Sequence, residues 1–223
     1  MTDDLTEYLA LVSQIGSPRS AIVAKPDEIN SARSMVSSAY HAFLSKYGYA
    51  VFGNGSFQLV NPSKFSPVLS QIFREDKQLL TENMCLVGIT AFGDLLVSQK
   101  DFGLIDVVFA QHWISSNEFS ASFGKEIDQN LRSAIFAKVM DSDNYDEAGE
   151  PLFDRCLTKL GPLMSGQIYA PVLPPAAGGN LDISNYRVAQ ASVAISLNAQ
   201  WDDFRLFDFA DPGGPRFVRT IGQ

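Results

Sequence analysis

Few residues of this chain could carry out acid–base or metal chemistry, and their spacing does not bring them together. The two histidines are His41, inside a predicted helix, and His112, beside Trp113. Neither has a partner at metal-ligand spacing, and no HExxH or CxxC pattern occurs. The two cysteines, Cys85 and Cys156, fall at apolar positions, where a buried thiol is expected. The sequence therefore predicts no catalytic residues, no bound metal and no cofactor.

Loops that bind phosphate or calcium are also absent from the pattern. The Gly53–Gly55 run lies between two strand-like segments, whereas a phosphate loop joins a strand to a helix. The run that begins at Asp141 has a tyrosine, Tyr145, where a calcium ligand is needed, and Leu152 at the bidentate glutamate position. Serine nucleophiles are not indicated, because no Gly-x-Ser-x-Gly elbow occurs.

An acidic run is the chemical feature that remains. Five carboxylates lie between Val139 and Asp154 with no lysine or arginine among them: Asp141, Asp143, Asp146, Glu147 and Glu150. Such a run is either a solvated loop or a patch that meets a cationic protein surface. We take these five as the first candidates for partner contact, and Trp201, Asp202 and Asp203 in the C-terminal tail as the second.

Composition predicts an acidic globular protein. The 223 residues are 46% hydrophobic and carry 25 acidic against 17 basic side chains, a formal charge of -8. This charge argues against direct nucleic-acid binding and suits a basic protein partner, although it also serves solubility alone. The N-terminus carries aspartates where a signal peptide needs positive charge, and no apolar run is long enough to span a bilayer. The cytoplasm is the expected compartment.

The N-terminal half predicts helices packed on an antiparallel meander. Residues 1–25 hold a short helix signal and a Gly-Ser-Pro break, and we expect them to form an N-terminal arm. A domain is predicted over residues 26–140. It begins with a helix from Asp27 to Tyr47, which Gly48 ends.

A hairpin and a meander are predicted next. The turn at residues 53–56 separates two short apolar segments, and Asn61 with Pro62 starts a second helix. Apolar runs between residues 84 and 109 predict the meander, after which a helical period continues to Val139. The fold class is therefore α+β.

The C-terminal half, residues 141–223, is predicted to be mostly helical and irregular. A short helix begins near Phe153 and stops at Gly161. The following segment is rich in Gly and Pro yet apolar, so we expect a fixed path without regular structure. Residues 184–199 suit a helix, although their Val and Ile content leaves a strand possible. Gly and Pro near residues 212–215 are expected to prevent a regular ending.

Two blocks of motifs resemble a known pairing of domains. The first block is Tyr47-Gly48-Tyr49 with Gly53, Phe57-Gln58-Leu59-Val60-Asn61-Pro62, and Thr90-Ala91-Phe92-Gly93-Asp94-Leu95. It resembles the GAD-like domain of bacterial proteins. The second block is Phe153, Leu160-Gly161-Pro162-Leu163, Ile168-Tyr169 and Gly178-Gly179, and it resembles the domain that commonly follows. Together they are similar to immunity proteins that protect type VI secreting bacteria from their own DNase effectors.

This resemblance implies a non-enzymatic inhibitor that binds a cognate nuclease effector in the cytoplasm. Two other classes stay open from the residues alone. One is an enzyme with a cleft between the halves, in which His112, Asp106 and Asp94 would act. The other is a regulatory or scaffold module that binds a peptide or small ligand at the apolar Gly/Pro segment. An immunity gene is expected beside a gene for a secreted nuclease, which distinguishes the first class from the other two.

Overall fold

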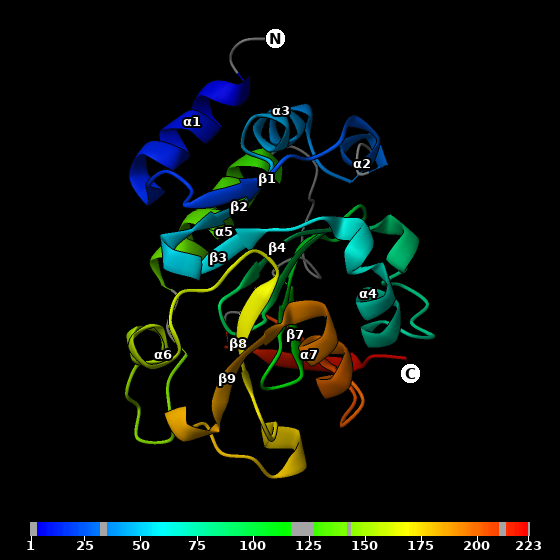
Figure 1. Ribbon diagram of the computed structural model, residues 1–223. Coiled ribbons are helices and arrows are strands. Elements are labelled where there is room, and N and C mark those ends of the chain that lie inside the picture. Colours follow the sequence, from blue (N-terminus) through cyan, green and yellow to red (C-terminus); the bar gives the residue numbers. More distant parts are fainter. Residues whose placement is uncertain (1–3, 32–34, 117–126, 142–143, 210–212, 223) are drawn as a thin grey trace.

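The computed structural model describes residues 4–31, 35–116, 127–141, 144–209 and 213–222, and it has an α+β fold, as predicted (Figure 1). Its main sheet has the strand order β1-β2-β3-β4-β5-β6-β7-β10-β11. The strands are β1 (Ser20–Ile22), β2 (Tyr49–Phe52), β3 (Phe57–Leu59), β4 (Met84–Thr90), β5 (Leu95–Gln99), β6 (Gly103–Val108), β7 (Trp113–Ser116), β10 (Arg205–Asp208) and β11 (Arg216–Thr220). A separate antiparallel pair is formed by β8 (Gln167–Pro171) and β9 (Tyr186–Gln190).

Helices lie on both faces of the main sheet. The α-helices of the described residues are α1 (Asp4–Ile15), α2 (Pro26–Ser31), α3 (Ser38–Tyr47), α4 (Ser66–Ile72), α5 (Ile127–Met140), α6 (Phe153–Leu160) and α7 (Ala191–Asn198). Successive side chains of β4 point to opposite faces, so Cys85 joins the core under α1, α3 and α5, while Leu86 joins the core under α4 and α7. All seven residues of β4 are consequently buried.

Several local predictions are confirmed. The hairpin joins β2 to β3 with Val51 opposite Gln58, and β4, β5 and β6 form the expected antiparallel meander. The Asn61 side chain accepts a hydrogen bond from the Ser63 amide and caps a short 3-10 helix, Pro62–Lys64, that leads into α4. Gly48 and Gly161 end helices α3 and α6 with φ of 63° and 81°, a region that favours glycine.

The N-terminal predictions need two corrections. The helix expected from Asp27 to Tyr47 is two helices, α2 and α3, and Ser37 caps the second by accepting a hydrogen bond from the Tyr40 amide. Residues 4–22 do not form a detached arm. Helix α1 buries Tyr8 completely against Phe43, and β1 pairs with β2 at the edge of the sheet. The part of the last N-terminal helix expected at residues 117–126 lies outside the described residues.

The C-terminal part is more regular than the Gly and Pro content predicted. The apolar segment after Gly161 contains β8, and the stretch from Ser184 divides into β9 followed by α7. The tail is not irregular either, because β10 pairs in parallel with β7 and β11 pairs with β10. These pairings are formed with distant strands, and local turn residues do not reveal them. Residues 141–223 as a separate domain stay a prediction.

Buried polar side chains attach the C-terminal part to the main sheet. Gln58 of β3 is fully buried, and its Nε2 donates to the Gln167 carbonyl at 2.7 Å while its Oε1 accepts from the Gly166 amide at 2.8 Å. The Tyr169 amide donates to the Ala91 carbonyl, and Asn198 Nδ2 donates to the Phe109 carbonyl. Strand β8 and helix α7 therefore have fixed positions on the sheet.

Candidate functional site

An open apolar groove of about 680 Å³ lies between helix α7 and the β8–β9 pair. The face of the pair that carries Ala170 and Ala189 lines one side of it. The segment Val172–Pro174 lines another part, and Val193 and Leu197 of α7 face it. Trp201 lines the groove just beyond the end of α7. The groove is therefore built from the Gly/Pro-rich segment and the helix that follows it.

The side chains that border this groove are unusually exposed for their type. Five large apolar residues have between 45% and 58% of their surface exposed: Val172, Leu173, Val193, Leu197 and Trp201. Single exposed apolar residues are normal on a protein surface, but a contiguous group marks an interaction site. This groove is more apolar than the hollow beside Tyr49 and Asn61 and the hollow between α1 and α5.

Helix α7 is apolar on both of its faces. Ala191 and Ile195 point into the core, whereas Val193 and Leu197 point to solvent. The helix contains no charged residue. Its hydroxyl group at Ser196 is bonded to Gln71 of α4 at 2.6 Å. Exposed faces of surface helices usually carry charged or polar residues, so the apolar strip of Val193 and Leu197 on the outer face of α7 is unusual.

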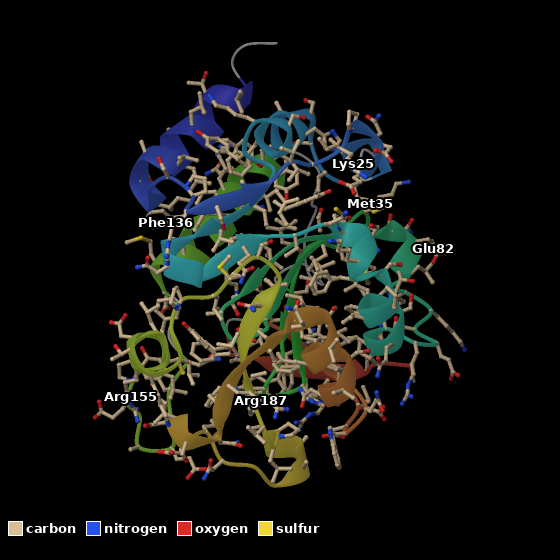
Figure 2. All side chains as sticks on the ribbon, in the orientation of Figure 1. Lys25, Met35, Glu82, Phe136, Arg155 and Arg187 are labelled. Carbon is tan, nitrogen blue, oxygen red and sulfur yellow. The ribbon has the colours of Figure 1, made fainter. Side chains whose placement is uncertain are left out.

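Four polar residues also line the groove: Arg187, Gln190, Asn198 and Gln200. Arg187 of β9 lines the groove, is exposed, and its guanidinium makes no ion pair with another described residue (Figure 2). Asn198 also lines the groove and is buried; its Nδ2 is used by Phe109, but its Oδ1 accepts no hydrogen bond from the described residues. The groove thus offers the cation of Arg187 and, at Asn198 Oδ1, a buried acceptor.

The acidic run forms an ordered loop whose central carboxylate has a structural role. Asp146 Oδ1 accepts hydrogen bonds from the amides of Ala148 and Glu150, and Oδ2 pairs with Arg155 Nη1 at 2.5 Å. The Arg155 guanidinium and these amides hold the pKa of Asp146 below its usual value. The Asp146 carboxylate therefore stabilises the loop through these contacts.

The other acidic candidates have different surroundings. Asp141, Glu147 and Glu150 are exposed and remain available to a partner, whereas Asp143 lies outside the described residues. We call Asp141, Glu147 and Glu150 the acidic surface. Arg155, which pairs with Asp146, was not counted in the sequence pattern because it follows the run.

The tail candidates lie on the other side of the β8–β9 pair. Trp201 lines the groove, Asp202 is exposed, and Asp203 pairs with Arg74 at 3.1 Å. Figure 1 shows α6, which follows the acidic loop, and α7, which precedes the tail, on opposite sides of this pair. The structure therefore joins Trp201 to the groove and leaves the acidic surface separate.

The residues considered for a cleft enzyme are not assembled into one site. His112 is buried, stacks on Phe204 with ring centroids 4.6 Å apart, and its Nδ1 lies 3.1 Å from the Asp202 carbonyl. Asp106 pairs with Lys138, and Asp94 accepts from the Phe109 amide. No contact among the described residues joins His112 to either carboxylate. Burial raises the pKa of Asp94, against the opposing effect of Lys138.

Other reactive groups lie in the core or apart from one another. Burial raises the pKa of the Cys85 thiol to about 12 and that of Cys156 to about 11, so both stay protonated at neutral pH. The described residues contain no cluster of three or more His, Cys, Asp or Glu side chains that could hold a metal ion. Among the described helices, none combines the length and apolar character that a bilayer span requires.

Comparisons with known proteins agree with the order of the two motif blocks. The family described as GAD-like domain matches residues 6–110, and the family described as T6SS immunity protein Tdi1, C-terminal, matches residues 130–202. No match was found among curated proteins. The crystal structure of Atu4351 from Agrobacterium tumefaciens is similar to this chain, with a TM-score of 0.90 and 29% sequence identity over 100% of this chain and 99% of that one. The chain therefore carries a match to the GAD-like domain followed by a match to the C-terminal domain of the T6SS immunity protein Tdi1, which is the pairing that the two motif blocks resemble.

Proposed function

We propose that this protein is an immunity protein that binds and neutralises a cognate type VI secreted DNase effector in the cytoplasm, without catalysis of its own. The observation that carries the proposal is the match of residues 130–202 to the immunity protein Tdi1 C-terminal domain. The net charge of -8 supports it, since a DNase presents a basic surface to the phosphates of its substrate. The immunity protein then inhibits the nuclease by covering its active site or its DNA-binding surface.

The test is inhibition of the nuclease encoded beside this gene. Increasing amounts of the purified protein are mixed with that nuclease, and plasmid cleavage and co-elution are measured. We expect cleavage to stop near equimolar protein, because immunity proteins of this kind reach dissociation constants of about 1 nM or below. Undiminished cleavage at molar excess would contradict the proposal.

The acidic surface is proposed to steer the encounter with the nuclease. Asp141, Glu147 and Glu150 are exposed, and two of them lie in a loop that Asp146 and Arg155 hold in a defined shape. Charges at the edge of an interface act mainly on the association rate and are screened by salt. The position of Asp146 inside the loop makes it a poor test residue, because its loss would change the loop as well as the charge.

Reversing two charges of the acidic surface is expected to slow association. The double variant Glu147→Lys/Glu150→Lys should associate with the nuclease about tenfold more slowly at low ionic strength, and its rate should depend less on salt. Stopped-flow measurements over a salt series check both effects. The control Glu75→Lys/Glu82→Lys makes the same change in charge, and Glu82 lies on the opposite side of the molecule from Arg155 (Figure 2). Equal rates for the two double variants would place the steering charges elsewhere.

A further inference from the structure

We infer that the groove beside α7 binds an amphipathic helix of the effector, whose apolar face packs on α7 and whose acidic side chain pairs with Arg187. This inference rests on the proposed function, since it names the element of the effector that the immunity protein holds. The groove is separate from the acidic surface that the sequence pattern indicated. Three properties of the groove favour this partner: the spacing of its exposed residues, its openness and its charge.

The spacing of the exposed residues suits a helical partner. Val193, Leu197 and Trp201 follow one another at intervals of four residues, and all three border the groove. Positions i, i+4 and i+8 form a ridge along one face of a helix, and eight residues span about 12 Å. Val193 and Leu197 form such a ridge on α7, and Trp201, in the turn after Asn198, borders the same groove. A second helix can lay its own apolar side chains along such a ridge over two turns.

The openness of the groove favours a protein segment over a small molecule. A small-molecule site typically encloses most of its ligand, whereas here Val172 and Leu173 on one rim and Val193 and Leu197 on the other are about half exposed. A partner must cover both rims of the groove to bury these four side chains completely. Trp201, at the end of the groove, is the residue type that most often contributes strongly to binding at protein interfaces.

Charge decides what the partner helix must carry. Arg187 is an exposed cation without an ion-pair partner among the described residues, in a chain whose formal charge is -8. An acidic side chain on the effector helix would pair with it beside apolar surface, where water screens the pair less than in bulk solvent. Asn198 Oδ1 offers a second polar contact, which a donor on the same helix can satisfy.

The first test removes the apolar ridge. The double variant Val193→Asp/Leu197→Asp is expected to bind the nuclease at least 100-fold more weakly than the unchanged protein, measured by calorimetry with the effector encoded beside this gene. The matched control is Val23→Asp/Met164→Asp, which changes exposed apolar residues that do not line this groove. Far-UV circular dichroism and the unfolding midpoint establish that both variants are folded.

The second test exchanges charges across the interface and keeps the proposal testable if the ridge variant does not fold. Arg187→Glu is expected to weaken binding about tenfold, as the loss of a charge-assisted hydrogen bond at an interface does. Lys77→Glu, an exposed lysine on the loop after α4, is the control for net charge. Acidic residues on exposed helices of the nuclease are then changed to lysine one at a time. One of them should restore binding to Arg187→Glu and weaken binding to the unchanged protein.

The outcomes separate this inference from the proposed function. If the unchanged protein inhibits the nuclease and both groove variants inhibit it equally well, the effector binds elsewhere and the inference is wrong, while the immunity function stands. If the unchanged protein does not bind the nuclease, both proposals are wrong. Concentration-dependent self-association that Leu197→Asp abolishes, together with unaltered nuclease binding by that variant, would assign the groove to a second copy of this chain instead.

Discussion

Replacing Gln58 by leucine is expected to lower the free energy of unfolding by about 3 kcal/mol. The Gln58 side chain is fully buried and bridges β3 to the start of β8, with one hydrogen bond to the Gln167 carbonyl and one from the Gly166 amide. Leucine has a similar volume but removes the partner of both backbone groups, which are partly buried. Each unsatisfied group costs about 1–3 kcal/mol, which is more than the added apolar surface returns.

Urea unfolding followed by fluorescence and circular dichroism measures this change. Gln14→Leu on the exposed side of α1 provides the control, because the same substitution there removes no buried hydrogen bond; its effect should lie within about 0.5 kcal/mol. A loss below 1 kcal/mol in Gln58→Leu would mean that the two halves are held together mainly by their apolar contacts. The shape of the groove beside α7 is expected to change as well, since β8 supports one side of it.

The variant Asp76→Asn is expected to be about 2 kcal/mol less stable than the unchanged protein at pH 7, and to lose that deficit in acid. The Asp76 side chain is buried, pairs with the Arg219 guanidinium through both oxygens, and accepts hydrogen bonds from the amides of Gln78, Leu79 and Gly222. Burial by itself would raise the pKa of Asp76, but these hydrogen bonds hold it at about 2.

The pH dependence of this effect has a definite direction. In the unfolded chain an aspartate has a pKa of about 3.9, so the ionised form favours the folded state at all pH values above that. As the pH falls from about 4 to about 2, the unfolded chain takes up the proton first and the stabilisation disappears. Asparagine does not titrate, so the difference between the two proteins should approach zero near pH 2.

Urea unfolding at pH 7, 4, 3 and 2 tests this expectation. The exposed pair of Arg74 and Asp203 gives a matched comparison, since both of its side chains are more than half exposed. Asp203→Asn should change the stability by less than about 0.5 kcal/mol at any of these pH values. A constant deficit of Asp76→Asn across the series would show that the size and packing of the side chain matter there, and not its charge.

Local signals in the sequence predicted the parts of the fold that local contacts determine. Gly48 and Gly161 end helices because a positive φ is required there, and Asn61 caps the helical segment that Pro62 begins. The hairpin and the meander were likewise predicted, since their strands are adjacent in the chain. The break between α2 and α3 was missed because the apolar spacing continues across it, although Ser37 was a capping signal within that stretch.

Pairings between distant segments could not be read from the sequence. Strand β10 lies beside β7, almost 90 residues earlier in the chain, and no feature of residues 205–208 specifies that neighbour. The two strands in the Gly/Pro-rich part were missed for a related reason. Turn residues mark where strands end, but the β8–β9 ladder forms across a connection of 14 residues, Val172 to Asn185.

The groove illustrates what the sequence could and could not show about the site. Trp201 was a candidate, but Val193 and Leu197 were not, because apolar residues in a helix ordinarily indicate the core face. A signal was nevertheless present: the helix Ala191–Asn198 has no charged residue on any side, which is unusual for a helix at the surface. Arg187 was missed because a single arginine in a strand belongs to no motif or spacing that would mark it as a binding residue.

The parallel pairing of β10 with β7 has a consequence for how the protein is made. While the ribosome is still adding residues 117–204, the backbone groups along the outer edge of β7 have no strand to bond with, and the sheet stays open at that side. Strands β10 and β11, which extend the sheet beyond β7, can pair only after residue 204 has been added. A chain cut before Arg205 would therefore expose the backbone groups of β7 as an unpaired sheet edge, to which another chain can pair.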